Sequence, residues 1–306
     1  RPIFILGLPR TGTTLLHNLM ALAPRGRAPL MWELLRPSPA PRFETRLNDP
    51  RIRRTKREVD GAMRLLPSMR AIHPLVPTGP DECFYLFNNS FMSPVAEAQA
   101  SVPGYMQWLM QTDMTPAYRY YRTQLQLLQR HIETDYWILK TPTHLFALDA
   151  LLAVFPDARI IQTHRAPRKI VASCCSLYET SRTLFTETVN PKRLGHRWLE
   201  TWGAAVDHAM DVRAKAGEAT FHDLYYEDFV SDPVRAVRSL HEALELDFDD
   251  AFVERMRRHL DDSPKKKFGT HHYSLARYGL TDEQVAGRFA GYIDRFPRST
   301  HEKHSS

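Results

Sequence analysis

Residues 2–14 read Pro-Ile-Phe-Ile-Leu-Gly-Leu-Pro-Arg-Thr-Gly-Thr-Thr. The apolar run at 2–6 predicts a short buried strand, because strands covered on both faces are continuously hydrophobic. A turn at 7–14 follows, and the apolar residues from Leu15 to Leu22 predict a helix. A glycine-rich turn between a strand and a helix directs backbone N–H groups and the helix dipole toward one point. This stretch therefore predicts a site for a phosphate or a sulfate.

The remainder of the chain alternates between short apolar runs and segments with helical spacing. Further strands are expected at residues 137–139, 158–163 and 220–224. Helices are expected around 32–35, over 51–66, 118–132, 145–154, 193–214 and 233–244, and from 169 and 281 onward. No repeat or low-complexity linker divides the chain. We therefore expect an α/β fold, a P-loop-like parallel sheet flanked by helices on both faces, in a single domain over residues 1–306.

The composition is that of an ordinary globular protein, with 43% hydrophobic and 25% charged residues among 306. The net charge of +6 suits an anionic small ligand. No nucleic acid partner is expected, because the only basic run is Lys265–Lys267 and no basic stripe is interleaved with aromatics. Three cysteines make no disulfide framework, and the apolar stretch Ile3–Leu6 is too short to span a bilayer. We expect a cytoplasmic location.

The loop departs from nucleotide-triphosphate loops at one position. Gly7 and Gly12 have the expected four-residue spacing, but Thr13 stands where those loops carry a lysine. Arg10, inside the loop, supplies a positive charge instead. Kinases and nucleotide hydrolases also hold Mg²⁺ with an Asp that ends a later strand, and the run 159–164 ends without one. No metal is therefore expected at this site.

Several blocks of the sequence resemble the sulfotransferases that use 3′-phosphoadenosine 5′-phosphosulfate (PAPS), most closely the bacterial branch related to tyrosylprotein sulfotransferases. They occur in the family's order from residue 3 to about 280. The blocks are Pro9–Thr14, Leu139–Pro142 with His144, Phe155–Ile161 continuing through Arg165 to Ser173, Tyr225–Phe229, and Lys265–Leu280.

The resemblance implies a set of nucleotide-binding residues. Arg165 and Ser173, eight residues apart, are expected on the 3′-phosphate. A guanidinium suits this dianion because it offers two parallel N–H donors. Tyr226 is expected beside the nucleotide, with Lys266 and Lys267 in the segment that closes over it. The loop residues implied for the 5′-phosphosulfate are Arg10, Thr11, Gly12, Thr13 and Thr14. The product would be 3′-phosphoadenosine 5′-phosphate (PAP).

The resemblance also implies catalytic residues. Lys140 is expected near the transferring sulfuryl group, where a fixed ammonium stabilises the growing charge. A general base is needed for the acceptor hydroxyl. Glu33 is the first candidate, His144 the second and Glu82 the third. Residues 33–135 are expected to shape the acceptor pocket, and the acceptor is a hydroxyl of a small molecule, a lipid or a sugar.

The sequence therefore predicts an enzyme that moves a sulfuryl group from PAPS to a hydroxyl by in-line, metal-independent transfer. Two alternatives remain open. The first is a metal-dependent ATP phosphotransferase, but this sequence has neither the loop lysine nor the strand-end Asp that such an enzyme uses. A non-catalytic nucleotide-binding protein of the same fold would have no need of Lys140, Glu33 and His144, which are all present.

Overall fold

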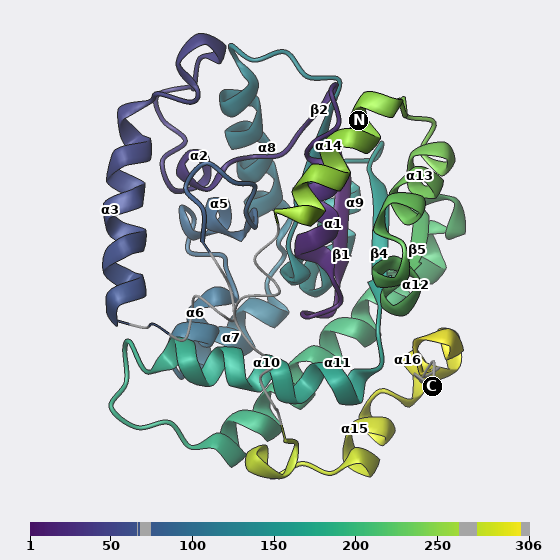
Figure 1. The fold of residues 1–306 in the computed structure, drawn as a ribbon. Coiled ribbons are helices and arrows are strands. Elements are labelled where there is room, and N and C mark those ends of the chain that lie inside the picture. Colours follow the sequence, from purple (N-terminus) through teal and green to yellow (C-terminus); the bar gives the residue numbers. More distant parts are fainter. Residues whose placement is uncertain (66, 68–74, 263–273, 301–306) are drawn as a thin grey trace.

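A computed structural model of the chain describes residues 1–65, 67, 75–262 and 274–300. Its centre is a five-stranded sheet in the order β2-β3-β1-β4-β5, and every neighbouring pair is parallel (Figure 1). The strands are β1 (Ile3–Gly7), β2 (Gly26–Arg27), β3 (Tyr136–Lys140), β4 (Arg159–His164) and β5 (Phe221–Tyr225).

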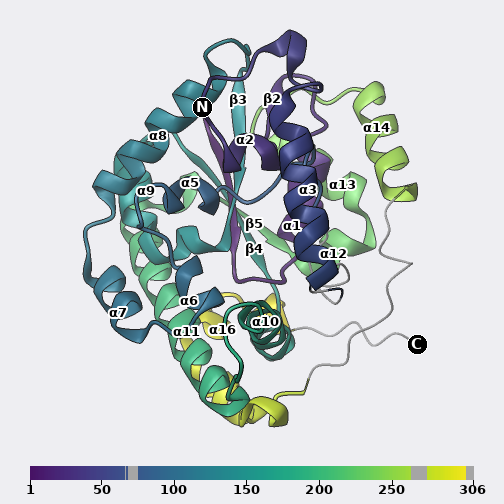
Figure 2. The same ribbon diagram turned by 90° about the vertical axis from the view of Figure 1, so that its left-hand side faces the viewer.

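Helices cover both faces of this sheet, so the predicted α/β fold class is confirmed. Figure 2 shows the two layers on opposite sides of the strands. One layer contains α1 (Thr13–Met20), α12 (Tyr226–Ser231), α13 (Pro233–Ala243) and α14 (Asp250–Asp261). The other contains α8 (Thr115–Gln129), α9 (Leu148–Val154), α10 (Pro167–Arg182) and α11 (Pro191–Ala216).

The remaining helices lie around these layers. Those on the left of Figure 1 are α2 (Met31–Leu35), α3 (Pro50–Leu65), α5 (Phe84–Asn88), α6 (Val95–Gln99) and α7 (Pro103–Gln111). The last two, α15 (Asp282–Arg288) and α16 (Ala290–Arg295), pack against α11, and α15 also contacts α10. Short 3₁₀ helices are η1 (Phe43–Thr45), η2 (Pro142–Ala147), η3 (Glu218–Thr220), η5 (Ala276–Tyr278) and η6 (Pro297–Thr300).

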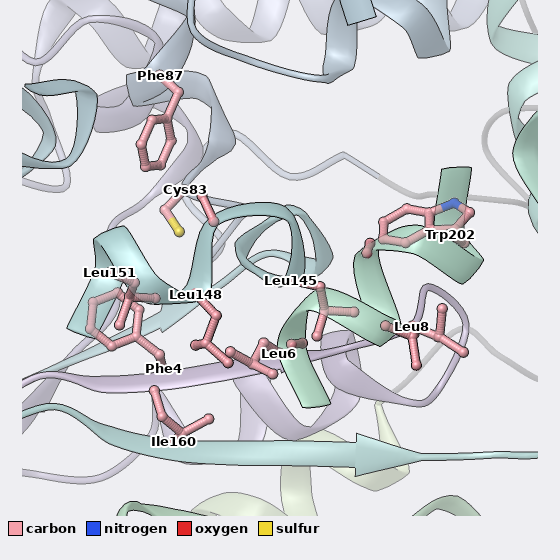
Figure 3. Close-up of a cluster of buried hydrophobic side chains, with 14 of the residues drawn as sticks. Phe4, Leu6, Leu8, Cys83, Phe87, Leu145, Leu148, Leu151, Ile160 and Trp202 are labelled. Carbon is pink, nitrogen blue, oxygen red and sulfur yellow. The ribbon is translucent and has the colours of Figure 1, made fainter. Parts of the chain in front are cut away.

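Strand β1 is the middle of the sheet because all of its side chains are apolar and buried. Successive residues of a strand face opposite sides. Ile3 and Ile5 pack with the layer that contains α1, whereas Phe4 and Leu6 pack with the layer that contains α9. Figure 3 shows this second cluster, with Phe4 and Leu6 close to Leu148. The continuous apolar run thus builds two hydrophobic cores at once.

Three details differ from the sequence-based expectations. Helix α1 begins at Thr13, two residues before Leu15, because Gly12 adopts φ 85 and serves as its N-cap. The helix expected from Leu145 begins as the 3₁₀ helix η2 and becomes α-helical only at Leu148. Strand β2 was not predicted, since two residues carry no periodic pattern. The capping signature at 281 is confirmed, as Thr281 and Gln284 cap α15 reciprocally.

Within the described ranges, no helix combines the length and the apolarity needed to cross a bilayer.

The close approach of β1 and β4 generates a stability prediction. Gly7 has φ 145, and a Cβ there would lie 2.4 Å from Thr163 Oγ1 and 2.5 Å from its carbonyl oxygen. We expect Gly7→Ala to lower the free energy of unfolding by at least about 2 kcal/mol. Gly61→Ala is the control, because a Cβ there meets nothing within 4 Å and alanine favours a helix by about 1 kcal/mol. Urea unfolding of both variants measures this, and a Gly7→Ala protein as stable as the wild type would contradict the argument.

Candidate active site

The loop after β1 presents the start of α1 toward the carboxyl edge of the sheet, where parallel sheets bind their ligands. Gly12 precedes α1 in the left-handed conformation, and no side chain caps the helix. The backbone N–H groups of the first turn are therefore not taken up by a cap. Arg10 also has a positive φ of 67, which is uncommon for a residue with a Cβ. Such a conformation persists only where surrounding contacts hold it.

Contacts from β4 and α10 hold Arg10 in place. Arg165 Nη1 donates to the carbonyl oxygen of Arg10 at 2.8 Å, and Arg10 Nε donates to Ser173 Oγ at 3.1 Å. The guanidinium of Arg165 lies 3.9 Å from the ring centroid of Tyr226. Its buried Nε has no hydrogen-bond partner among the described residues. Four of the side chains predicted to bind the nucleotide thus lie together, and one of them, Arg165, has an unsatisfied donor.

The Thr11 side chain is directed into the protein interior. Its hydroxyl is fully buried and donates to the carbonyl oxygen of Leu8 at 2.7 Å. The same hydroxyl hydrogen-bonds to Thr163 Oγ1 at 2.6 Å, which ties the loop to the end of β4. Thr13 is likewise buried, whereas Thr14 is exposed. The side chains of Thr11 and Thr13 therefore lie on the buried side of the loop, and the side chain of Thr14 lies on its solvent-exposed side.

Lys140 ends β3 next to this loop, and its side chain is only 1% exposed. Its Nζ donates to Glu82 Oε1 at 2.8 Å and to Thr14 Oγ1 at 3.4 Å. Thr141 Oγ1 donates to the other oxygen of Glu82 at 3.2 Å. Glu82 keeps 18% of its side chain exposed. An ammonium, a carboxylate and the first turn of α1 therefore share one location.

Glu33 is fully buried and belongs to a separate ion-pair cluster. Its Oε1 accepts from Arg27 at 2.9 Å and from Arg46 at 3.0 Å, and its Oε2 accepts from the N–H of Leu30 at 2.9 Å. Burial lowers the pKa of Arg27 to about 10, and the charge of Glu33 opposes that shift. Both carboxylate oxygens of Glu33 are thus occupied by groups that hold α2 in place.

His144 is enclosed by aromatic side chains in the core. Its Nδ1 hydrogen-bonds to the hydroxyl of Tyr118 at 2.7 Å, and its Nε2 contacts Cys83 Sγ at 3.3 Å. The Phe4 ring packs edge-on at 5.1 Å. Cys83, in turn, donates its N–H to the carbonyl oxygen of Lys140 at 3.0 Å. His144 therefore reaches the Lys140 and Glu82 pair through Cys83 and not by direct contact.

One buried network was missed by the sequence analysis. His164, the last residue of β4, hydrogen-bonds through Nδ1 to Tyr292 of α16 at 2.9 Å and through Nε2 to Asp223 at 2.8 Å. Arg213 donates to the same Asp223. The network fixes the strand end that carries Arg165. A histidine directly before Arg165 was a visible signal, but nothing local pointed to Tyr292.

The predicted residues thus fall into groups. Arg10, Arg165, Ser173 and Tyr226 meet on one side of the loop, and Lys140 and Glu82 meet at Thr14. Glu33 and His144 have buried partners of their own. Lys266 and Lys267 lie outside the described residues. In the part of the chain that the structure describes, no three His, Cys, Asp or Glu residues are grouped to hold a metal ion.

Comparisons with known proteins identify the family of the chain. A sequence model of the Sulfotransferase family matches residues 2–250, so the chain belongs to this family and the predicted resemblance is confirmed. Sulfotransferase STF1 of Mycobacterium tuberculosis H37Rv is 36% identical with a TM-score of 0.84, over 95% of this chain and 76% of that one. Sulfotransferase STF9 of Mycobacterium avium is 32% identical with a TM-score of 0.87, over 97% of this chain and 76% of that one.

A curated relative is the omega-hydroxy-beta-dihydromenaquinone-9 sulfotransferase Stf3 of Mycobacterium bovis and Mycobacterium tuberculosis. It is 25% identical over 316 residues, which is 98% of this chain and 76% of Stf3. Sulfuryl transfer is therefore the reaction class of the family to which the chain belongs.

The buried histidines generate a pH prediction. Burial lowers the pKa of His144 to about 3, from an ordinary value near 6.5. Below about pH 6.5, the His144 imidazole becomes protonated in the unfolded chain but stays neutral in the folded chain. Stability present above that pH is therefore lost progressively as the pH falls toward 3. His17, whose pKa burial and Lys140 also lower to about 3, acts in the same direction.

We expect the melting temperature of the wild type to fall steadily from pH 7 to pH 4. His144→Gln should be less stable at pH 7 but lose less on acidification, because one of the buried imidazoles whose pKa is lowered is gone. Scanning calorimetry of both proteins across this range measures the effect. If the melting temperatures of the two proteins fell by the same amount between pH 7 and pH 4, the lowered pKa of His144 would be contradicted.

Proposed function

We propose that the chain transfers the sulfuryl group of PAPS to an acceptor hydroxyl, in line and without a metal ion. The observation that carries the proposal is the position of Lys140. Its ammonium is buried at the start of α1, between Thr14 and Glu82. A phosphate loop without its own lysine thus has a lysine delivered from the neighbouring strand. We also propose that residues 1–306 act as one sulfotransferase domain.

The residues around Arg10 suit the donor. Uncapped N–H groups at the start of α1 would hold its 5′-phosphosulfate. The unsatisfied Nε of Arg165, stacked on Tyr226, would meet the 3′-phosphate, and Ser173 would add a hydroxyl donor. Two fixed sites for anionic groups on the same ribose would also set the direction of the sulfuryl group. Orientation of this kind is a large part of catalysis by positioning.

Lys140 would act on the leaving group. In the transfer, a bond forms between sulfur and the acceptor oxygen, and the bond from sulfur to the 5′-phosphate oxygen breaks. Negative charge grows on that phosphate oxygen. A buried ammonium close to the first turn of α1 stabilises this charge more in the transition state than in the ground state.

Glu82 is the general base that we propose for the acceptor hydroxyl. The polar side-chain atoms of all three candidates are hydrogen-bonded, those of Glu82 to Lys140 and Thr141. Glu33 and His144 are also fully buried. Glu82 is partly exposed and contacts Lys140. A base must come within hydrogen-bond reach of the hydroxyl whose proton it takes. Access therefore favours Glu82.

We propose an apolar acceptor that carries a hydroxyl, bound by residues 33–135. Stf3 is named for a menaquinone-derived lipid with an omega-hydroxyl group. In this chain, Tyr85 is partly buried, and the loss of solvent together with the charges of Asp81 and Glu82 raises the pKa of its phenol. Phe84 packs on the Tyr85 ring at 4.2 Å. An aromatic wall beside Glu82 suits a lipid better than a sugar. The ATP phosphotransferase alternative has no support from these relatives.

Removal of the 3′-phosphate tests the donor assignment. In EDTA, the wild type should bind PAP on the order of 100-fold more tightly than AMP, the size of a charge-assisted pair. In Arg165→Gln this ratio should fall toward one, while AMP affinity reports whether the loop is intact. Arg257→Gln, an exposed arginine of α14, is the matched control. Isothermal calorimetry gives all the constants. Equal binding of PAP and AMP by the wild type, or a strict Mg²⁺ requirement, would exclude the proposal.

Separate variants distinguish the candidate bases. Glu82→Gln should lower kcat by about 100-fold or more, abolish the acidic limb of the pH profile and leave PAP affinity unchanged. Glu33→Gln should instead lower the melting temperature, because it leaves Arg27 buried without its counter-ion. Turnover followed against pH, with melting curves for each protein, measures both effects. If Glu82→Gln keeps near-normal turnover while folded Glu33→Gln loses it, the base is Glu33.

A further inference from the structure

Helix α3 carries a stripe of arginines on its outer face. Arg57 and Arg64 follow Arg53 by four and eleven residues, which at about 100° per residue places the three within about 40° of arc. All three are exposed. The buried residues Thr55, Val59 and Met63 lie at about 200° to 280° from Arg53, outside the arc of the arginines. Figure 2 shows α3 at the front of the molecule in that view.

The acidic residues of α3 do not neutralise the stripe. Glu58 accepts from Arg36 and Arg54, and Asp60 pairs with Lys56. Among the described residues, no ion pair involves the three stripe arginines. Gly61 also faces outward between Arg57 and Arg64, and a Cβ added there would meet nothing within 4 Å. The stripe is therefore cationic and sterically open.

Exposed apolar side chains stand at both ends of the same helix. Phe43 and Leu47, just before α3, are 72% and 73% exposed, and Leu65 at its last position is 75% exposed. Single exposed apolar residues are ordinary on protein surfaces. Here three of them bracket one open basic stripe. An amphipathic combination of this kind is typical of helices that lie on a lipid surface.

The helix is fixed to the acceptor side of the molecule. Arg36, which ends α2, donates to Thr55 and Glu58 of α3. Residues of α2 and α3 fall within 33–135, the range proposed to bind the acceptor. A surface that approached α3 would therefore lie on the side of the acceptor segment.

We propose that the outer face of α3, with Phe43, Leu47 and Leu65, is a docking surface for an anionic lipid bilayer. The arginines would contact acidic headgroups, and the three apolar side chains would enter the interface. The proposal rests on the proposed lipid acceptor, which an enzyme must collect from a membrane. The charge of the stripe matches anionic headgroups, and the exposed apolar residues favour a bilayer over nucleic acid.

Co-sedimentation with vesicles tests this surface without any turnover. The full chain should bind vesicles of phosphatidylglycerol and phosphatidylcholine, bind less as salt is raised, and ignore vesicles of phosphatidylcholine alone. Each arginine near an anionic surface contributes about fivefold to partitioning, so Arg53→Gln, Arg57→Gln and Arg64→Gln together should weaken binding roughly 100-fold. The matched control changes three exposed basic residues on other elements, Arg130→Gln, Lys215→Gln and Arg257→Gln. It should retain most of the binding.

A second variant, Phe43→Ser with Leu47→Ser, should also weaken vesicle binding, because apolar contact contributes to it. An equal loss in the control, no vesicle binding by the wild type, or tighter binding to double-stranded DNA at the same salt would each overturn the proposal. PAP affinity should be unchanged in the arginine variant, because none of the three arginines is among the residues proposed to bind PAP. Failure of the wild type to bind PAP would contradict the proposed sulfotransferase function, whereas vesicle binding tests only this surface.

Discussion

The site depends on one interaction, the ion pair between the buried ammonium of Lys140, at the carboxyl edge of the sheet, and the carboxylate of Glu82. The register of β1 and β3 places Lys140 opposite Ile5, so the lysine ends its strand where the loop after β1 begins. Removing a charge from water is costly unless other groups compensate it. Here Glu82 and Thr14 provide the compensation. We propose that Lys140, from a neighbouring strand, takes the place of the lysine that nucleotide-triphosphate loops carry within themselves.

Buried polar residues behind this pair act as its support. Cys83 connects His144 to the backbone of Lys140, and it follows Glu82 directly in the chain. Burial keeps the His144 imidazole neutral, so its hydrogen bonds hold position without adding charge. On the far side of the loop, His164 and Tyr292 hold the end of β4 from which Arg165 reaches Arg10. The two halves of the site are thus each fixed from the core.

The sequence predicted the features that local patterns encode. The apolar run of β1, the glycine at position 12 and the strand end at Lys140 are read from a few adjacent residues. Pairings across long separations were not predictable in this way. Glu82 meets Lys140 across 58 residues, and His164 meets Tyr292 across 128. The two ion pairs of Glu33 likewise required the folded chain, because its neighbours in sequence, Trp32 and Leu34, gave no sign of them.

The most direct test of the account is Lys140→Ala, measured with PAPS and an acceptor hydroxyl compound in single turnover and with PAP by calorimetry. If the ammonium acts on charge that develops only during transfer, turnover should fall by at least ~100-fold while PAP affinity changes little. If both quantities fall by the same factor, Lys140 only binds the nucleotide. In that case the central claim, that β3 supplies the catalytic charge missing from the loop, would be wrong.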